Sequence, residues 1–116
     1  MNTVEVRIHS DVVKIITLRG EHDLGTTRAI EVAFATDSGH NILVDLSGAS
    51  FIDSSVINVL LGSAQAARAR ASSVELVAAH SSFPRRVIEL CGIQLALPLH
   101  GDLAAGLASI DSRHSC

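Results

Sequence analysis

Apolar and polar residues alternate along this chain with two different periods. Period-two alternation and short apolar runs between turn residues predict five strands, at residues 4–8, 12–18, 42–45, 74–78 and 93–97. Apolar residues at helical spacing predict four helices, at residues 24–35, 54–71, 84–91 and 102–110. Because most strands alternate with helices, we expect an α/β fold with a mixed, mostly parallel sheet of about five strands.

Residues with cap and turn chemistry set the ends of these elements. Asp23 can cap the helix at 24–35, and Ser82 can cap the helix at 84–91, which has Pro84 in its first turn. Gly92 ends that helix, and Pro98 ends the predicted strand at 93–97. A turn at residues 10–11 predicts that the first two strands pair as an antiparallel hairpin.

The stretch at residues 41–61 carries the most chemically suggestive group. A buried strand, a loop of small residues at 47–50 and the cluster Asp53-Ser54-Ser55 precede the long helix. One interpretation is N-capping, in which side-chain oxygens accept the free N–H groups of the first turn. The other is a regulatory hydroxyl, because the dipole and free amides of a helix N-terminus favour a phosphate. The two are compatible, since one serine can cap while the other is exposed.

A face of small and polar residues continues along this helix. Ser55, Asn58 and Gly62 are spaced i, i+3 and i+7, so they share a face that another surface could approach closely. The loop after the second strand also leads into a helix, so we expect it at the same end of the sheet. The candidate partner-binding residues are Asp53, Ser54, Ser55, Asn58, Gly62, Glu21, His22, Asp23 and Thr26.

Composition narrows the possible functions. The chain has 116 residues, 47% of them hydrophobic and 18% charged, which predicts one domain over residues 1–116 with a frayed tail at 111–116. The net charge of −3 and the scattered basic residues argue against a nucleic-acid partner. The sequence has neither an apolar run long enough for a membrane span nor a signal-peptide pattern, so we expect a cytoplasmic protein without membrane insertion.

Familiar catalytic and metal-binding patterns do not occur in the sequence. The six histidines are dispersed, and the serines lack both the G-x-S-x-G context and a histidine at a related spacing, so we expect no catalytic or metal-ligating residue. We also expect no cofactor, because no phosphate-binding glycine motif occurs. Cys91 lies in an apolar segment and is interpreted as buried, and Cys116 is terminal; a redox switch between them is an alternative.

Several segments together resemble the STAS domains, in particular the small bacterial anti-sigma-factor antagonists. They are LRGEHDL, ILVDLSGASFIDSSV, VLLGSAQAARAR, VELVAA and RRVIELCGI, in this order, before a final Ala- and Leu-rich helix. The specific part is a strand ending V-D-L-S followed by F-I-D-S-S. The resemblance implies a STAS-like β/α superhelix.

The resemblance also implies a function in partner switching. In the family, the unphosphorylated antagonist binds an anti-sigma factor that is also a serine kinase, and this frees a sigma factor for transcription. The kinase phosphorylates the antagonist and so releases it, and a phosphatase resets the cycle. The family's acceptor lies two positions after the aspartate, which is Ser55 here, with Asp53 and Ser54 at the flanking positions.

The chain departs from the usual family pattern after the two serines. Glycines commonly follow there, whereas this chain has Val56 and Asn58, which we expect to add side chains to the surface that a kinase approaches. The alternative function is therefore a STAS scaffold or accessory subunit, in a signalling assembly or lipid-transport complex, that has no phosphorylation cycle or is redox-regulated. The sequence leaves open whether the chain forms a homodimer.

Overall fold

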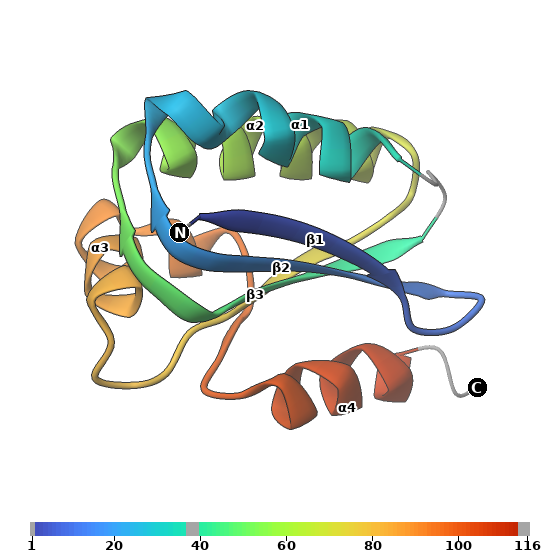
Figure 1. The fold of residues 1–116 in the computed structure, drawn as a ribbon. Helices are drawn as coiled ribbons and strands as arrows, with labels where there is room; N and C mark the ends of the chain where they lie inside the picture. Colours follow the sequence, from blue (N-terminus) through green and yellow to red (C-terminus); the bar gives the residue numbers. More distant parts are fainter. Residues whose placement is uncertain (1, 37–39, 114–116) are drawn as a thin grey trace.

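The chain folds around one twisted sheet of five strands (Figure 1). A computed structural model describes residues 2–36 and 40–113. The strand order is β1-β2-β3-β4-β5; β1 pairs with β2 in antiparallel orientation, and the other neighbours are parallel. The strands are β1 (Thr3–Ile8), β2 (Val13–His22), β3 (Asn41–Ile52), β4 (Val74–Val77) and β5 (Leu99–His100). This mixed sheet confirms the predicted fold class.

Helices cover both faces of the sheet (Figure 1). The α1 and α2 helices lie together on one face, α4 lies on the other, and α3 packs beside the end of β3. The helices are α1 (Thr27–Ala35), α2 (Ser54–Ala69), α3 (Phe83–Cys91) and α4 (Leu103–Arg113), with short 3-10 turns at Leu24–Thr26 and Ile93–Leu95. Among the described residues, no helix combines the length and apolar character that crossing a bilayer requires.

Alternation along the central strands builds one apolar layer on each side of the sheet. Side chains such as Ile16 and Val44 point toward α1 and α2 and form the larger core cluster. Their neighbours Ile15 and Leu43 point the other way and pack with Ile110 of α4. Strands buried on both faces read as nearly continuous apolar runs, which is what the sequence shows for β2 and β3.

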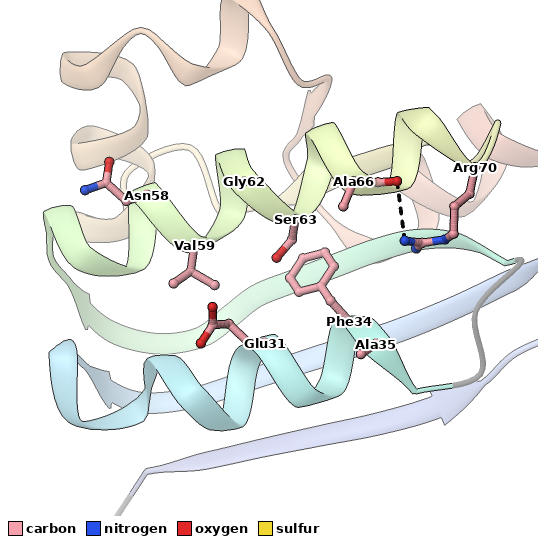
Figure 2. A pocket seen from close by; sticks show the side chains of 9 residues that line it. All are labelled: Glu31, Phe34, Ala35, Asn58, Val59, Gly62, Ser63, Ala66 and Arg70. Carbon is pink, nitrogen blue, oxygen red and sulfur yellow. Dashed lines mark hydrogen bonds between the residues drawn. The ribbon is translucent and has the colours of Figure 1, made fainter.

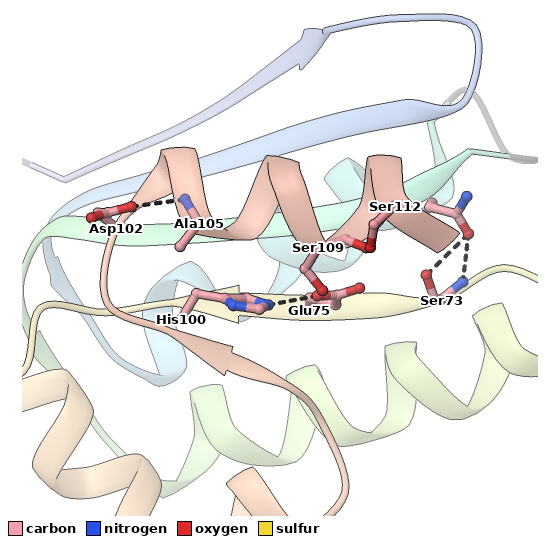
Figure 3. Close-up of polar contacts among 8 residues, drawn as sticks. Ser73, Glu75, His100, Asp102, Ala105, Ser109 and Ser112 are labelled. Atoms are coloured by element: carbon pink, nitrogen blue, oxygen red, sulfur yellow. Dashed lines mark hydrogen bonds and ion pairs between the residues drawn. The ribbon is translucent and has the colours of Figure 1, made fainter. Parts of the chain in front are cut away.

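Three ionisable side chains are fully buried among the described residues: Lys14, Glu75 and His22, of which Lys14 and Glu75 lie at opposite faces of the sheet. The Lys14 ammonium donates to the carbonyl oxygens of Ala33 and Phe34, at 2.8 and 3.1 Å, and to that of Thr36. It thereby satisfies the free carbonyls at the C-terminal end of α1, where the helix dipole favours a positive charge. On the opposite face, beneath α4, Glu75 Oε1 lies 2.6 Å from His100 Nε2 (Figure 3).

Local cap signals predicted several element ends correctly. Asp23 accepts a hydrogen bond from the N–H of Gly25, although the element that it caps is the 3-10 turn Leu24–Thr26, and α1 begins only at Thr27. The Ser82 hydroxyl accepts a hydrogen bond from the N–H of Arg85 and caps α3 as predicted. Gly92 has a φ of +74°, in the left-handed region that favours glycine, and it ends α3 as expected.

The prediction of a last strand at residues 93–97 is wrong. Residues Ile93–Leu95 form a 3-10 turn, and β5 follows Pro98 rather than preceding it. The apolar run bends so that Ile93 and Leu97 enter the core while Leu95 stays 88% exposed. The Pro98 carbonyl accepts from the N–H of Leu76, so proline introduces the strand here instead of ending it.

Other predictions need correction as well. The β2 strand runs on to His22, and β3 continues through residues 47–50, which were expected to form a loop. Cys91 is exposed, not buried, because it lies on the solvent side of α3. The α4 helix runs through residues 111–113, which were expected to fray, while Cys116 and the rest of the predicted tail lie outside the described residues.

Candidate functional site

The N-terminus of α2 holds the aspartate and two serines singled out in the sequence. Asp53 is the N-cap, and its Oδ1 accepts hydrogen bonds from the N–H groups of Ser55 and Val56 at 3.0 and 3.3 Å. The Ser55 hydroxyl donates to the same oxygen at 2.5 Å. The aspartate therefore does the capping, and it also fixes the direction of the Ser55 hydroxyl proton.

These hydrogen bonds favour the ionised form of Asp53. Its pKa is lowered from the ordinary value of 3.8, chiefly by the Ser55 hydroxyl. Partial burial opposes the shift, and the N–H groups of Val56 and Ser55 add to it. A carboxylate is thus held next to a hydroxyl at the positive end of a helix of 16 residues.

The side chains after Asp53 differ in their access to solvent. Ser54 is exposed, and Ser55 is half-buried. Val56 is completely buried in the core, so the expectation that it adds bulk to the outer surface is wrong. Asn58 is exposed on that surface. Asn58 is consequently the only one of the two departures from the family pattern that a docking protein would meet.

The end of β2 lies directly beside the end of β3. Glu21 pairs with Phe51, and His22 pairs with Ile52, the residue before Asp53. Parallel pairing therefore brings the loop after β2 to the N-terminus of α2, as the sequence predicted. Glu21 and Asp23 are exposed at this end.

His22 is placed differently from the other candidate residues, because its ring is fully buried. Its Nε2 lies 2.9 Å from the Arg19 carbonyl oxygen, which only accepts, so Nε2 donates there. Its Nδ1 lies 3.0 Å from the hydroxyl oxygen of Thr26. The ring thus ties β2 to the turn before α1, and we assign it a positioning role instead of a surface contact.

A groove runs between α1 and α2, and its first lining residue on α2 is Asn58, three residues after Ser55 (Figure 2). Its volume is about 510 Å³. Glu31 and Phe34 of α1 face Val59 and Ser63 of α2 across it, as Figure 2 shows. The remaining lining residues are Ala35, Asn58, Gly62, Ala66 and Arg70. Two of the predicted partner-binding residues, Asn58 and Gly62, therefore line this groove.

Gly62 leaves open space on the α2 surface. A Cβ built at this position meets no atom within 4 Å outside the local helix backbone. Packing inside the protein therefore does not require glycine here, and the absence of a side chain leaves the groove open at this position.

Phe51 and Phe83 are surface aromatics that the sequence analysis did not assign to the site. Their rings stack with centroids 5.5 Å apart and planes at 14°. They are 38% and 46% exposed. Phe51 alternates with the buried Ile52 in the strand pattern, which was the available signal that its side chain points outward. The stack gives the Asp53 end of the sheet an exposed apolar element.

Similar solved structures share this architecture over nearly the whole chain. An anti-sigma factor antagonist from Mycobacterium paratuberculosis is 28% identical, with a TM-score of 0.83 over 94% of this chain and 93% of its own. SpoIIAA in its unphosphorylated form is 19% identical, with a TM-score of 0.74 over 98% of both chains. The Bacillus protein SpoIIAA in its phosphorylated form is 19% identical, with a TM-score of 0.71 over 93% of this chain and 99% of its own.

Two sequence comparisons, one with curated proteins and one with family models, complete this picture. No curated protein sequence gives a significant match to this chain. The family model described as STAS domain matches residues 3–105, which include the complete sheet, the helices α1 to α3 and the first three residues of α4. The chain belongs to the STAS domain family.

Proposed function

We propose that this chain is an anti-sigma factor antagonist, a binding protein without catalytic activity of its own. It acts in the cytoplasm by binding an anti-sigma factor that is also a serine kinase, and phosphorylation of Ser55 releases it from this partner. A phosphatase restores the binding form. The relative that is 28% identical and described as an anti-sigma factor antagonist supports the assignment of the partner class.

The observation that carries the proposal is the hydrogen bond from the Ser55 hydroxyl to Asp53, at 2.5 Å on the first turn of α2. The proton points at the carboxylate, so the oxygen lone pairs remain available to accept a phosphoryl group. The Ser55 hydroxyl is thus held in one orientation by its hydrogen bond to Asp53. Ser54, its exposed neighbour, provides a matched comparison.

Phosphorylation of Ser55 would change the local charge without breaking the helix. In phosphoserine the hydroxyl proton is replaced by the phosphoryl group, so the hydrogen bond from Ser55 to Asp53 is lost. The phosphate also adds a charge of about −1.5 to −2 beside the carboxylate. Asp53 keeps the hydrogen bonds from the N–H groups of Ser55 and Val56. The fold is therefore preserved, while a partner surface that approaches α2 meets new bulk and negative charge.

The binding surface we propose extends from the start of α2 in two directions. One arm is the groove lined by Asn58 and Gly62. The other is the stacked pair Phe51 and Phe83, next to the exposed side chain of Glu21. Aromatic groups beside a polar rim are typical of protein–protein contacts, and this composition supports a protein as the partner.

The test is a binding assay between the purified chain and the anti-sigma factors of its own organism. We expect Ser55→Ala to bind like wild type and to resist release by ATP. Ser55→Asp should weaken binding by at least about tenfold, because like charge and desolvation oppose docking. Ser54→Asp adds the same charge one residue away and should have a smaller effect.

Circular dichroism on each variant separates loss of binding from loss of fold. Equal affinities of wild type and Ser55→Asp for a partner that does bind would exclude the phosphorylation switch. They would favour the STAS scaffold, for which stable co-purification with a transport or signalling complex is the expected result.

A further inference from the structure

The strand β1 forms one edge of the sheet and presents an open backbone (Figure 1). It has six residues and pairs only with β2 among the described strands. Val6 and Ile8 are 38% and 47% exposed, and Val32 of α1, on the same face of the sheet, is 53% exposed. An open edge with exposed β-branched side chains is a template for pairing with another strand.

The hydrogen bonds of the β1–β2 hairpin show which backbone groups are open. The N–H of His9 donates to the Val13 carbonyl at 2.9 Å, while the neighbouring Val12 carbonyl accepts from Asn41 on the β3 side. In an antiparallel pair, hydrogen-bonded residues alternate with residues that point away. With the observed register, Arg7 and Glu5 bond to β2, and the N–H and C=O groups of Val4, Val6 and Ile8 point to the free edge.

We propose that β1 pairs with β1 of a second copy of this chain, in antiparallel orientation about a two-fold axis at Val6. In this register Val6 lies opposite Val6 of the second copy, and Val4 lies opposite Ile8. All three residues have outward-pointing backbone groups, so they form the hydrogen-bonded pairs. The two five-stranded sheets become one continuous sheet of ten strands.

Charge selects this register over its neighbours. Glu5 and Arg7 point to the sheet face opposite from Val4, because side chains alternate along a strand. In the proposed register Glu5 lies opposite Arg7 of the second copy, twice, at positions where side chains approach closely. Alternative registers of the two β1 strands differ by two residues. A shift that is not a multiple of two would place residues whose N–H and C=O groups point to the free edge opposite residues whose groups already bond to β2. A step in one direction would place Glu5 opposite Glu5, and a step in the other would place Arg7 opposite Arg7.

The ion pairs within one chain leave Arg7 available for the proposed contact with Glu5 of the second copy. Glu5 forms an ion pair with Arg19 of β2. Within the described residues Arg7 has no ion pair of its own. Charged residues on an edge strand usually prevent pairing. Here their order, glutamate followed two residues later by arginine, makes one antiparallel register attractive and the adjacent registers repulsive.

This dimer leaves the start of α2 accessible. The α2 helix follows β3, and β2 separates β3 from the β1 edge. The two Ser55 residues of a dimer therefore lie on separate protomers, away from the two-fold axis. The inference does not depend on the proposed function, and its failure would leave that function untouched.

The first test is sedimentation velocity under reducing conditions, from about 1 µM to about 1 mM, a range that covers weak and moderate dimers. We expect a concentration-dependent dimer. Val6→Pro should abolish it without unfolding the chain, because the Val6 N–H points away from β2 and proline is tolerated on such an edge. Amide exchange by NMR should show Val4, Val6 and Ile8 becoming protected as the concentration rises, while Glu5 and Arg7 are protected throughout.

The second test exchanges the charges. Arg7→Glu and Glu5→Arg should each weaken self-association by about tenfold, since each puts two like-charge pairs across the axis. An equimolar mixture of the two variants should associate again, because every cross-strand pair in the heterodimer then joins a negative side chain to a positive one. A monomer at every concentration, a dimer that survives Val6→Pro, or a mixture no tighter than the single variants would overturn the proposal.

Discussion

Two glycines on two helices should respond in opposite ways to the same substitution. Gly106 lies on the face of α4 that packs against the sheet, whereas Gly62 lies on the open surface of α2. A Cβ at Gly106 would lie 2.8 Å from one methyl carbon of Leu43 and 3.1 Å from a methyl carbon of Val77. A Cβ at Gly62 would meet nothing within 4 Å.

The expected magnitudes follow from these contacts. Replacing glycine by alanine inside a helix gains about 0.5–1 kcal/mol, and this gain is common to both sites. Overpacking a well-filled core costs about 1–3 kcal/mol, and this cost applies to Gly106 alone because Leu43 is fully buried. We therefore expect Gly62→Ala to raise the free energy of unfolding by up to about 1 kcal/mol. Gly106→Ala should lower it by about 1 kcal/mol.

The assay is urea unfolding of both variants and wild type, followed by circular dichroism. Because the gain in helix propensity is the same in both variants, the difference between their free energies of unfolding reports the steric cost at α4. We expect this difference to be about 1–3 kcal/mol. Thermal melts should separate the variants by about 4 °C or more, since 1 kcal/mol corresponds to roughly 4 °C for a domain of this size. A Gly106→Ala chain as stable as Gly62→Ala would show that α4 does not pack as closely as described.

Three further predictions concern charge and surface. Lys14→Met should lower the free energy of unfolding in urea by about 2–3 kcal/mol, because it removes a charged donor from the carbonyls at the end of α1; no loss would refute that role. The folded-state pKa of Asp53 lies below its unfolded value of 3.8, so its ionised form stabilises the protein above that pH, and the contribution is lost as the pH falls through the folded-state pKa. Asp53→Asn should therefore be less stable than wild type at pH 5–7, with a difference that shrinks below about pH 4; a pH-independent difference would contradict the assignment. Phe51→Ala should weaken anti-sigma factor binding by about tenfold in the binding assay, whereas Leu95→Ala, which removes an apolar side chain exposed elsewhere, should not; equal effects would exclude a specific role for the Phe51–Phe83 stack.

Sequence patterns predicted the features that local chemistry determines. Asp53, Ser82 and Gly92 act within one turn of their own helices, and their cap roles could be read from residue type and spacing. The placement of the loop after β2 at the same end of the sheet as the start of α2 also followed, because parallel strands bring their C-terminal ends to one edge of the sheet.

Features that depend on distant partners could not be predicted in the same way. The run at residues 93–97 has the composition of a strand, but the residues that pair with β4 are Leu99 and His100. The α1–α2 groove depends on how two helices lie on the sheet, which neither helix specifies by itself. Val56 is a different case, because a local signal was available: it lies four residues before Leu60, and this helical spacing directs both side chains into the core.

The measurement that tests the central proposal most directly is phosphorylation-site mapping by mass spectrometry, on protein isolated from the cells that naturally contain it, with and without stress. Cleavage by chymotrypsin after Phe51 and Leu60 gives a short peptide whose hydroxyl groups belong only to Ser54 and Ser55. We predict phosphate on Ser55 in a condition-dependent fraction of the protein. A clearly observed peptide that carries no phosphate under any condition, or carries it on Ser54 alone, would contradict the proposed switch.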